Sequence, residues 1–138
     1  MIPPLITPEN LTKDLLKVIL DSAMIDNSFN SNGWLVATET IKVLVSPEGE
    51  KKDRIHLWSI FTLKEGLDEL DLLRVVNKIN EELVIVRAYI DNDKDSLFFD
   101  WSIPVMGGIT PKNFVLALKR FSTIPHIAFE KYGQGIFR

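Results

Sequence analysis

The stretch "LVIVRAYIDNDKDSLFFDWSIPV", residues 83–105, contains two apolar segments joined by a short polar one. This period of two is typical of β-strands, and two such strands around a short polar turn pair antiparallel. The stretch therefore predicts a β-hairpin. The alternating apolar residues are Val84, Val86, Ala88 and Ile90 in the first strand, and Leu97, Phe99, Trp101 and Ile103 in the second.

Three more strands are predicted upstream of the hairpin, over residues 34–39, 41–47 and 54–63. These segments are rich in β-branched and alternating apolar residues, which favour strands. Between them and the amino terminus, the segment "DNSFNSNG" (residues 26–33) is rich in asparagine, serine and glycine, so it predicts a loop.

Three helices are predicted from apolar residues at helical spacing, over residues 7–23, over residues 68–82 and from residue 111 onwards. Caps and prolines set their expected ends. The residues concerned are Thr7 (cap) and Pro8 (first turn) for the first helix, and Thr110 (cap), Pro111 (first position), Pro125 (interruption), Gly133 and Gly135 (terminator) for the third.

The expected order is therefore α-βββ-α-ββ-α, an α+β fold in which helices flank a five-stranded antiparallel sheet. Strands joined by short turns pair antiparallel, and helices must cover at least one face of the sheet to bury its apolar residues. A chain of 138 residues is the length of one typical domain, so residues 1–138 are expected to form a single domain.

Composition excludes several classes of protein. The chain has 16 basic and 19 acidic residues, mixed along its length, so we expect no nucleic-acid partner. It has no cysteine, which excludes disulfides, thiolate zinc sites and a cysteine nucleophile. No apolar run reaches the roughly 20 residues of a membrane helix, and the amino terminus does not resemble a secretory signal. We therefore expect a cytoplasmic protein with no membrane partner.

The segment "DNDKD" places Asp91, Asp93 and Asp95 at alternate positions, as in a calcium-binding loop of the EF-hand type. Such a loop needs glycine next and a glutamate at its end, where this chain has Ser96 and Ser102. The segment is therefore expected to be a hairpin turn and not a metal site. Asp100 lies within the following strand, and if it is buried it needs a partner, for which Arg87 on the neighbouring strand is suitable.

No catalytic set is found elsewhere in the sequence. The only histidines, His56 and His126, lie 70 residues apart and no serine sits in a nucleophile elbow. The glycines of "GGIT" and "YGQGIF" match neither a phosphate-binding loop nor a dinucleotide fingerprint, so no cofactor is expected.

The predicted sheet carries apolar side chains on both faces. If helices cover the face that contains Leu57, Phe61, Val86 and Phe99, the other face is left open, and exposed apolar patches mark interaction sites. The three tryptophans, all on predicted strands, are expected to fill the core or a protein interface. The residues expected on the open face, and expected to bind a partner, are Trp58, Ile60, Ile85, Tyr89 and Phe98.

The second half of the chain resembles the YbjN family of bacterial sensory transduction regulators, most clearly over residues 68–122. In that family a helix with a "VN…N" signature precedes a strand, a polar turn, a second strand and a helix that starts with "(I/V)T.E.F". This chain departs from the pattern at Lys112, where the family often has an acidic residue. The matching positions are Val76, Asn77 and Asn80, then residues 91–96, then Ile109, Thr110 and Phe114.

The resemblance implies a fold like that of the type III secretion chaperones, commonly dimeric, which bind extended segments of client proteins. It brings no catalytic residues. Asn77 and Asn80 are expected to be structural, tying the second helix to the strand after it, and Thr110 and Pro111 to start the last helix. The leading hypothesis is thus a non-enzymatic, homodimeric adaptor or chaperone with a polypeptide client.

Two alternatives stay open at this point. The first is a small enzyme or a ligand- or metal-binding protein that uses the carboxylates from Asp91 to Asp100 together with a histidine. The second is a toxin-neutralising protein, because its acidic small-domain profile is the same.

Overall fold

The computed structural model describes residues 1–91, 93, 95–132 and 135, which form three helices and six strands. None of the helices in this part of the chain is both long and apolar enough to cross a membrane. The helices are α1 (Lys13–Ser22), α2 (Glu69–Glu82) and α3 (Pro111–Tyr132). The strands are β1 (Asp26–Phe29), β2 (Leu35–Thr38), β3 (Lys42–Glu48), β4 (Arg54–Thr62), β5 (Arg87–Ile90) and β6 (Ser96–Pro104).

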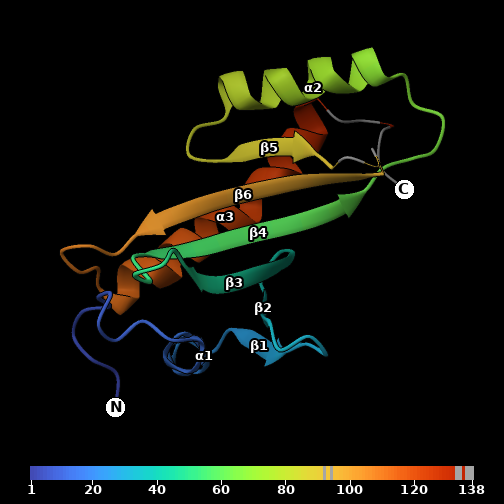
Figure 1. The fold of residues 1–138 in the computed structure, drawn as a ribbon. Helices are drawn as coiled ribbons and strands as arrows, with labels where there is room; N and C mark the ends of the chain where they lie inside the picture. The colour runs from blue at the N-terminus through green and yellow to red at the C-terminus, as the bar shows by residue number, and fades with distance from the viewer. Residues whose placement is uncertain (92, 94, 133–134, 136–138) are drawn as a thin grey trace.

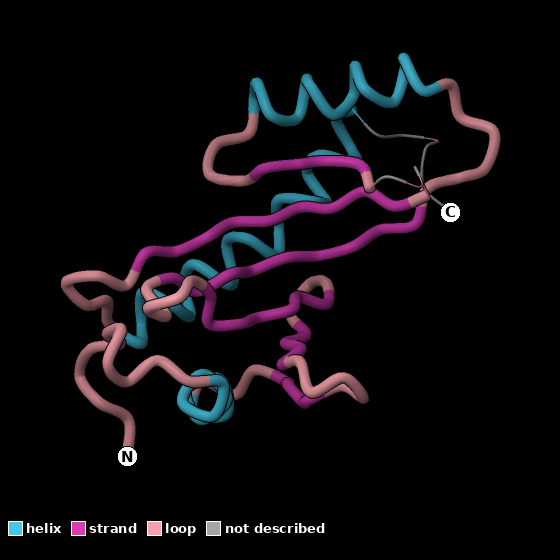
Figure 2. Tube along the Cα trace, viewed as in Figure 1, coloured by secondary structure: helices cyan, strands magenta, loops and turns pink. Residues whose placement is uncertain are grey.

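All six strands form one antiparallel sheet in the order β1-β2-β3-β4-β6-β5. The predicted hairpin is confirmed as the pair β5 and β6, and β6 also pairs along its whole length with β4 (Figure 2). β6 therefore lies between β4 and β5, and the two longest strands, β4 and β6, are neighbours in the sheet.

The prediction of five strands was wrong, because residues 26–29 form β1 within the segment expected to be a loop. β1 pairs with β2 at the edge of the sheet, and three of its four side chains are exposed. An edge strand with little buried side chain has no apolar alternation, so polar residues fill it as they would fill a loop. The α+β class and the antiparallel sheet with helices are confirmed.

The helices form a layer on one face of the sheet. In Figure 1, α3 runs diagonally behind β4 and β6, with α2 beyond β5 and α1 beside β1. The core lies between α3 and the sheet, where Phe114, Leu118 and Phe121 of α3 and Leu57 and Phe99 of the sheet are fully buried. Fully burying each of these side chains stabilises the fold by roughly 1.5–3 kcal/mol.

The first helix begins later than predicted. Thr7, expected to be its cap, instead begins a turn in which its N–H donates to the Asn10 side chain and its carbonyl accepts from Leu11 N–H. The cap is Thr12, whose hydroxyl accepts from Leu15 N–H at 3.0 Å. Both threonines can cap a helix, but the backbone at Thr7 is held in the turn with Asn10, so the helix begins after Thr12.

The prediction that Pro125 interrupts the last helix was also wrong, because α3 continues through it to Tyr132. A proline inside a helix costs about 3 kcal/mol, since it removes one hydrogen bond and crowds the preceding turn. Phe121 before it and Ala128 after it are both fully buried, so packing on both sides offsets that cost. The start of α3 is as expected, with Thr110 Oγ1 accepting from Asn113 N–H ahead of Pro111.

β5 is shorter than predicted and begins at Arg87. Ile85 has a φ of 72°, a left-handed conformation that a β-branched side chain rarely adopts, so the strand cannot extend back through it. The loop between α2 and β5 is visible in Figure 2 ahead of the short strand. The terminator expected at Gly133 lies outside the described residues.

Candidate functional site

The candidate site is the face of the sheet that is opposite α3, and we call it the open face. In Figure 1 no described helix passes in front of β4 and β6 on this side. Strand register places Ile60, Phe98 and Tyr89 in one cross-strand row, and Trp58, Asp100 and Arg87 in the row beside it. The predicted face assignment is therefore correct for Trp58, Ile60, Tyr89 and Phe98. Ile60 is 46% exposed, while the three aromatic side chains are half-buried.

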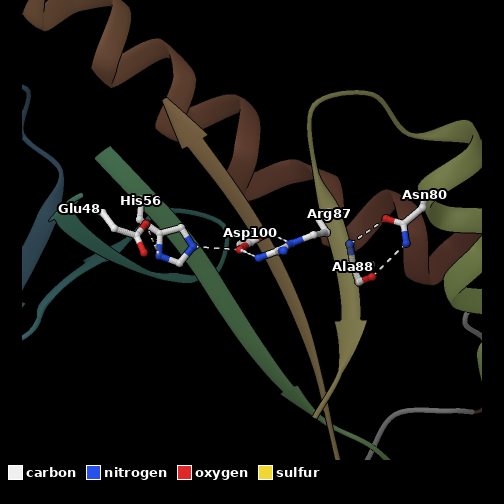
Figure 3. Close-up of polar contacts among 6 residues, drawn as sticks. All are labelled: Glu48, His56, Asn80, Arg87, Ala88 and Asp100. Carbon is white, nitrogen blue, oxygen red and sulfur yellow. Dashed lines mark hydrogen bonds and ion pairs between the residues drawn. The ribbon is translucent and has the colours of Figure 1, made fainter. Parts of the chain in front are cut away.

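A carboxylate lies at the centre of this face. Asp100 is buried, with its side chain 7% exposed, and accepts two hydrogen bonds from Arg87, Nε to Oδ1 at 3.0 Å and Nη2 to Oδ2 at 2.6 Å. His56 Nε2 lies 3.0 Å from Asp100 Oδ2, and His56 Nδ1 faces Glu48 Oε2 at 3.4 Å. Figure 3 shows the four side chains in a line across β3, β4, β6 and β5.

The electrostatics follow from this geometry. Burial raises the pKa of Asp100, but the hydrogen bonds from Arg87 and His56 and the attraction to these side chains outweigh it. The pKa of Asp100 therefore lies below its ordinary value of 3.8. The same hydrogen bond with Asp100 raises the pKa of Arg87. The pair is thus charged on both sides, and the buried carboxylate is compensated.

Aromatic rings surround this polar line. The His56 ring stacks on Trp58 with centroids 4.6 Å apart, and Trp34 meets Trp58 edge-on at 5.5 Å. On the other side, Arg87 lies over the Tyr89 ring at 4.8 Å from its centroid. The Arg87 side chain is 69% exposed, but its contacts with Asp100 and Tyr89 hold the guanidinium in one orientation.

The remaining aromatic side chains differ in their surroundings. Tyr89 and Phe98 stack in parallel at 5.0 Å, so they present one continuous apolar surface. Trp101 is partly buried against the core, while Trp34, immediately before β2, is 43% exposed and does not fill the core. The tryptophans therefore divide between the core and the open face.

A hollow of about 560 Å³ lies over the polar line, and its lining includes Glu48, Arg54, Arg87 and Tyr89. Ile85 also lines it, although it precedes β5 and is not part of the cross-strand row. Ile85 is partly buried against the core and lines the hollow, so it does not belong to the cross-strand row of Ile60, Phe98 and Tyr89.

Asn80 ties α2 to β5 through both ends of its amide. Its Nδ2 donates to the Ala88 carbonyl at 3.0 Å, and its Oδ1 accepts from the Ala88 N–H at 2.8 Å (Figure 3). The amide thus takes the place of a neighbouring strand at the outer edge of β5. Asn77 is exposed and makes no side-chain hydrogen bond with the described residues, so this link depends on Asn80.

The aspartate segment is a turn, as expected. Asp91 Oδ1 accepts from the backbone N–H groups of Asp95 and Ser96, which is how an aspartate stabilises a turn of its own chain. Asp100 is on the sheet face with Arg87 and His56, apart from this turn. Among the described residues, no three histidine, cysteine, aspartate or glutamate side chains are placed to hold a metal ion.

The arrangement is suited to holding side chains in position. Both nitrogens of His56 face carboxylates, so the ring fixes Asp100 from one side while Arg87 fixes it from the other. Sequence reasoning anticipated the pairing of Asp100 with Arg87 but missed Glu48 and His56. The sequence indicated only that His56 lies on the same strand face as Trp58. It did not indicate the register of β4 against β6, which brings His56 to Asp100.

Solved structures with the same fold cover most of this chain. The crystal structure of YbjN from E. coli aligns with a TM-score of 0.75 at 17% identity, over 91% of this chain and 94% of that one. The HopA1–SchA chaperone–effector complex contains a chain that aligns with a TM-score of 0.56 at 13% identity, over 89% and 93%. The type III secretion chaperone SycH of Yersinia pestis gives 0.54 at 13%, over 85% and 96%. These likenesses show the fold.

A search among curated proteins gave no match. A family model does match, over residues 12–131, and its description is "Putative bacterial sensory transduction regulator". The match includes every strand, the helices α1 and α2 and nearly all of α3. On this evidence the chain belongs to the YbjN family.

Proposed function

We propose that this chain is a protein-binding module without enzymatic activity, an adaptor or chaperone that recognises a polypeptide on the open face. The observation that carries the proposal is a sheet face left uncovered by the helix layer, with aromatic and apolar side chains in rows around a fixed Arg87–Asp100 pair. Aromatic residues and arginine are the side chains that contribute most to binding energy at protein interfaces.

The structural neighbours support a polypeptide partner. Two of them are complexes of a chaperone with another protein: the HopA1–SchA chaperone–effector complex, and the chaperone SycH with a fragment of YscM2. The family description, with its reference to sensory transduction, supports a regulatory adaptor. The complexes of the chaperones with other proteins support the polypeptide partner, and the family description supports the regulatory role.

In the proposed mechanism, apolar side chains of the partner pack against Trp58, Ile60, Tyr89 and Phe98, and Ile85 extends this contact within the hollow that it lines. Arg87 has N–H donors beyond the two that Asp100 uses, and its side chain is 69% exposed, so carbonyl or carboxylate oxygens of the partner can accept hydrogen bonds from them. Because Asp100 and Tyr89 already fix the guanidinium, little conformational entropy is lost when it binds.

The proposal also covers the state of the protein in the cell. We propose a single domain over residues 1–138 that forms a homodimer and acts in the cytoplasm; the dimer is what the resemblance to the type III secretion chaperones implies. Light scattering after size-exclusion chromatography measures the mass in solution, and a monomer at all concentrations would remove the dimer from the proposal without affecting the open face.

The test compares partner capture by matched variants. Tagged wild-type protein, Trp58→Asp and Ile60→Asp are used as baits in a lysate of the source bacterium, with Met106→Asp as the control. Met106 is 72% exposed in the loop before α3, away from the open face, so the control adds the same charge to another exposed apolar residue. Circular dichroism confirms that each variant is folded.

We expect a partner that wild type and Met106→Asp retain and that both open-face variants lose by at least about tenfold, since a desolvated carboxylate in an apolar contact costs several kcal/mol. Equal capture by all four baits would rule out the open face as the binding surface.

A further inference from the structure

The hollow of about 560 Å³ over Glu48, His56, Asp100 and Arg87 is named here the polar hollow. Its described lining contains two arginines, Arg54 and Arg87, and two carboxylates, so apart from His56 its formal charges balance. The two signs differ in what they have left to bind. The carboxylates are engaged within the chain, while the guanidinium groups keep exposed N–H donors.

Both carboxylates of the polar hollow have partners. Asp100 is buried and is held by Arg87 and His56. Glu48 lies opposite Arg54 in the register of β3 and β4, but the ion pair that it makes is with His56 Nδ1, at 3.4 Å. Asp100 therefore offers almost no surface to a partner, and Glu48, 43% exposed, is the more accessible carboxylate of the two.

The two guanidinium groups are more accessible. Arg87 donates to Asp100 from Nε and Nη2 (Figure 3), and its Nη1 makes no hydrogen bond with the described residues. Arg54 is 47% exposed, and its ion pair with Asp53, from Nε to Oδ1 at 3.6 Å, is longer than a hydrogen bond. Planar N–H donors of both arginines therefore remain available to a partner along the hollow.

We propose that the polar hollow binds the side-chain carboxylate of an aspartate or glutamate in an extended segment of the partner. A carboxylate matches the planar fork of donors on a guanidinium, and such charge-assisted pairs are stronger than hydrogen bonds to a neutral carbonyl. The inference deepens the proposed function, on which it rests, because it states which residue the partner must carry.

The open face also sets the residue that accompanies the acid. Arg87 and Tyr89 are alternate residues of β5, so the polar hollow and the row of Ile60, Phe98 and Tyr89 are about 7 Å apart. Alternate side chains of an extended segment that runs along the strands have the same spacing. An acidic residue over the hollow therefore brings an apolar residue, two positions away, over that row.

The test uses a capped peptide, acetyl-Ser-Leu-Ser-Glu-Ser-Leu-Ser-amide, and the same peptide with glutamine in place of glutamate. Leucine stands two positions away on each side of the central residue, and the caps leave the glutamate side chain as the sole carboxylate. Each peptide is titrated to millimolar concentration into ¹⁵N-labelled protein. NMR follows the backbone amides and the side-chain Nε–H signals of Arg54 and Arg87.

Two pairs of variants locate the site. Arg54→Gln removes one guanidinium of the hollow and leaves the buried ion pair intact, and its control is Arg74→Gln, because Arg74 is exposed on α2 and outside the lining. Glu48→Gln removes the accessible carboxylate, and its control is Glu9→Gln, at an exposed position outside the lining. Each variant has the same net charge as its control. Circular dichroism confirms that all four are folded.

We expect the glutamate peptide to bind wild type about tenfold or more tightly than the glutamine peptide, since hydrogen bonds to charged groups contribute more than neutral ones. Arg54→Gln should weaken binding of the glutamate peptide about fivefold and Glu48→Gln should strengthen it about fivefold, while both controls stay within about twofold of wild type. The Arg54 and Arg87 Nε–H signals should shift with the glutamate peptide alone.

Three outcomes would overturn the proposal. They are equal affinity of the two peptides for wild type, no binding of the glutamate peptide at millimolar concentration, and equal losses in Arg54→Gln and Arg74→Gln. The third would reduce the effect to net charge.

The proposed function fails by a different result, which is equal lysate capture by wild type, Trp58→Asp and Ile60→Asp. If both peptides bind wild type equally and Ile60→Asp weakens both, the open face binds polypeptides without selecting an acidic residue. The carboxylate site is then rejected while the proposed function stands.

Discussion

Asp100 is a charged side chain where an apolar one would be easier to bury. It is 7% exposed at the centre of the open face, and its charge is compensated by Arg87 and His56. Replacing such a pair with apolar residues of similar size is often neutral for stability or even favourable. We therefore assign the pair a different role. It fixes the direction in which Arg87 presents its remaining donors.

Removing Arg87 tests how much Asp100 depends on it. We expect Arg87→Ala to lower the free energy of unfolding by about 1–3 kcal/mol, because it leaves a buried carboxylate with His56 as its remaining partner. Urea unfolding followed by tryptophan fluorescence measures this change. Arg74→Ala is the matched control, since Arg74 is 71% exposed and its ion pair with Asp71 is on the surface. A loss no larger than that of the control would show that Arg87 does not compensate Asp100.

The lowered pKa of Asp100 predicts how stability changes with pH. The folded carboxyl binds a proton less readily than the unfolded one, so its contribution is fully present above the ordinary value of 3.8 and is lost as the pH falls through the lower folded value. Asp100→Asn lacks this contribution. We therefore expect the stability difference between wild type and Asp100→Asn to be constant from neutral pH to about 5 and to shrink below it.

Urea midpoints measured from neutral to acidic pH give this difference directly. If the difference grew as the pH fell, the pKa of the folded carboxyl would lie above its ordinary value and the compensation by Arg87 would be refuted.

At the scale of single residues, the sequence was informative where chemistry leaves few choices. A buried aspartate requires a cation, and Arg87 on the neighbouring strand was the available one. His56 was not predictable, because its contact with Asp100 depends on the register of β4 against β6. Register follows from the packing of a whole face and not from any residue pair.

At the scale of elements, one side chain of α2 makes hydrogen bonds to the backbone of β5. The Asn80 amide bonds both backbone groups of Ala88, at the edge where β5 has no neighbouring strand. An unpaired edge strand is a template for pairing with other chains, and proteins commonly protect such edges. Asn80 therefore secures the helix and closes the edge at the same point.

We expect Asn80→Ala to destabilise the protein by about 1–2 kcal/mol, since two hydrogen bonds to the backbone are lost. The Ala88 amide hydrogen should also exchange with solvent much faster, which NMR-detected hydrogen exchange measures. Asn77→Ala is the control, because Asn77 lies on the same helix, is exposed and makes no side-chain hydrogen bond with the described residues. Unchanged protection of the Ala88 amide in Asn80→Ala would contradict this assignment.

Elements with buried faces were predictable from sequence, and elements set by local competition were not. The hairpin of β5 and β6 was correct because both strands bury alternate side chains. β1 was missed because its side chains are mostly exposed. The cap at Thr12 and the unbroken helix at Pro125 depend on a turn and on core packing, and neither leaves a mark in the local sequence.

At the scale of the whole molecule, helices cover one face of the sheet and leave the open face available. The core is built from apolar side chains of all three helices and the sheet. We expect millimolar calcium or magnesium to leave the melting temperature unchanged, because only an ion that binds the folded state stabilises it. Differential scanning fluorimetry measures this.

A rise of several degrees with calcium, absent in Asp93→Asn, would instead support the metal-binding alternative for the turn. The same titration with sodium at equal ionic strength is the control for simple screening of the carboxylates in the turn.

The closed edge at Asn80 has a consequence for assembly. A sheet with two free edges is a bifunctional monomer, which adds copies at both ends and grows into a filament. Here β5 is blocked at Ala88, while β1, the opposite outermost strand, has no further strand beside it among the described residues. With only one such edge, the chain is monofunctional: it can pair with another copy through β1 alone. Any edge-to-edge association between copies would therefore stop after a single step, at a pair.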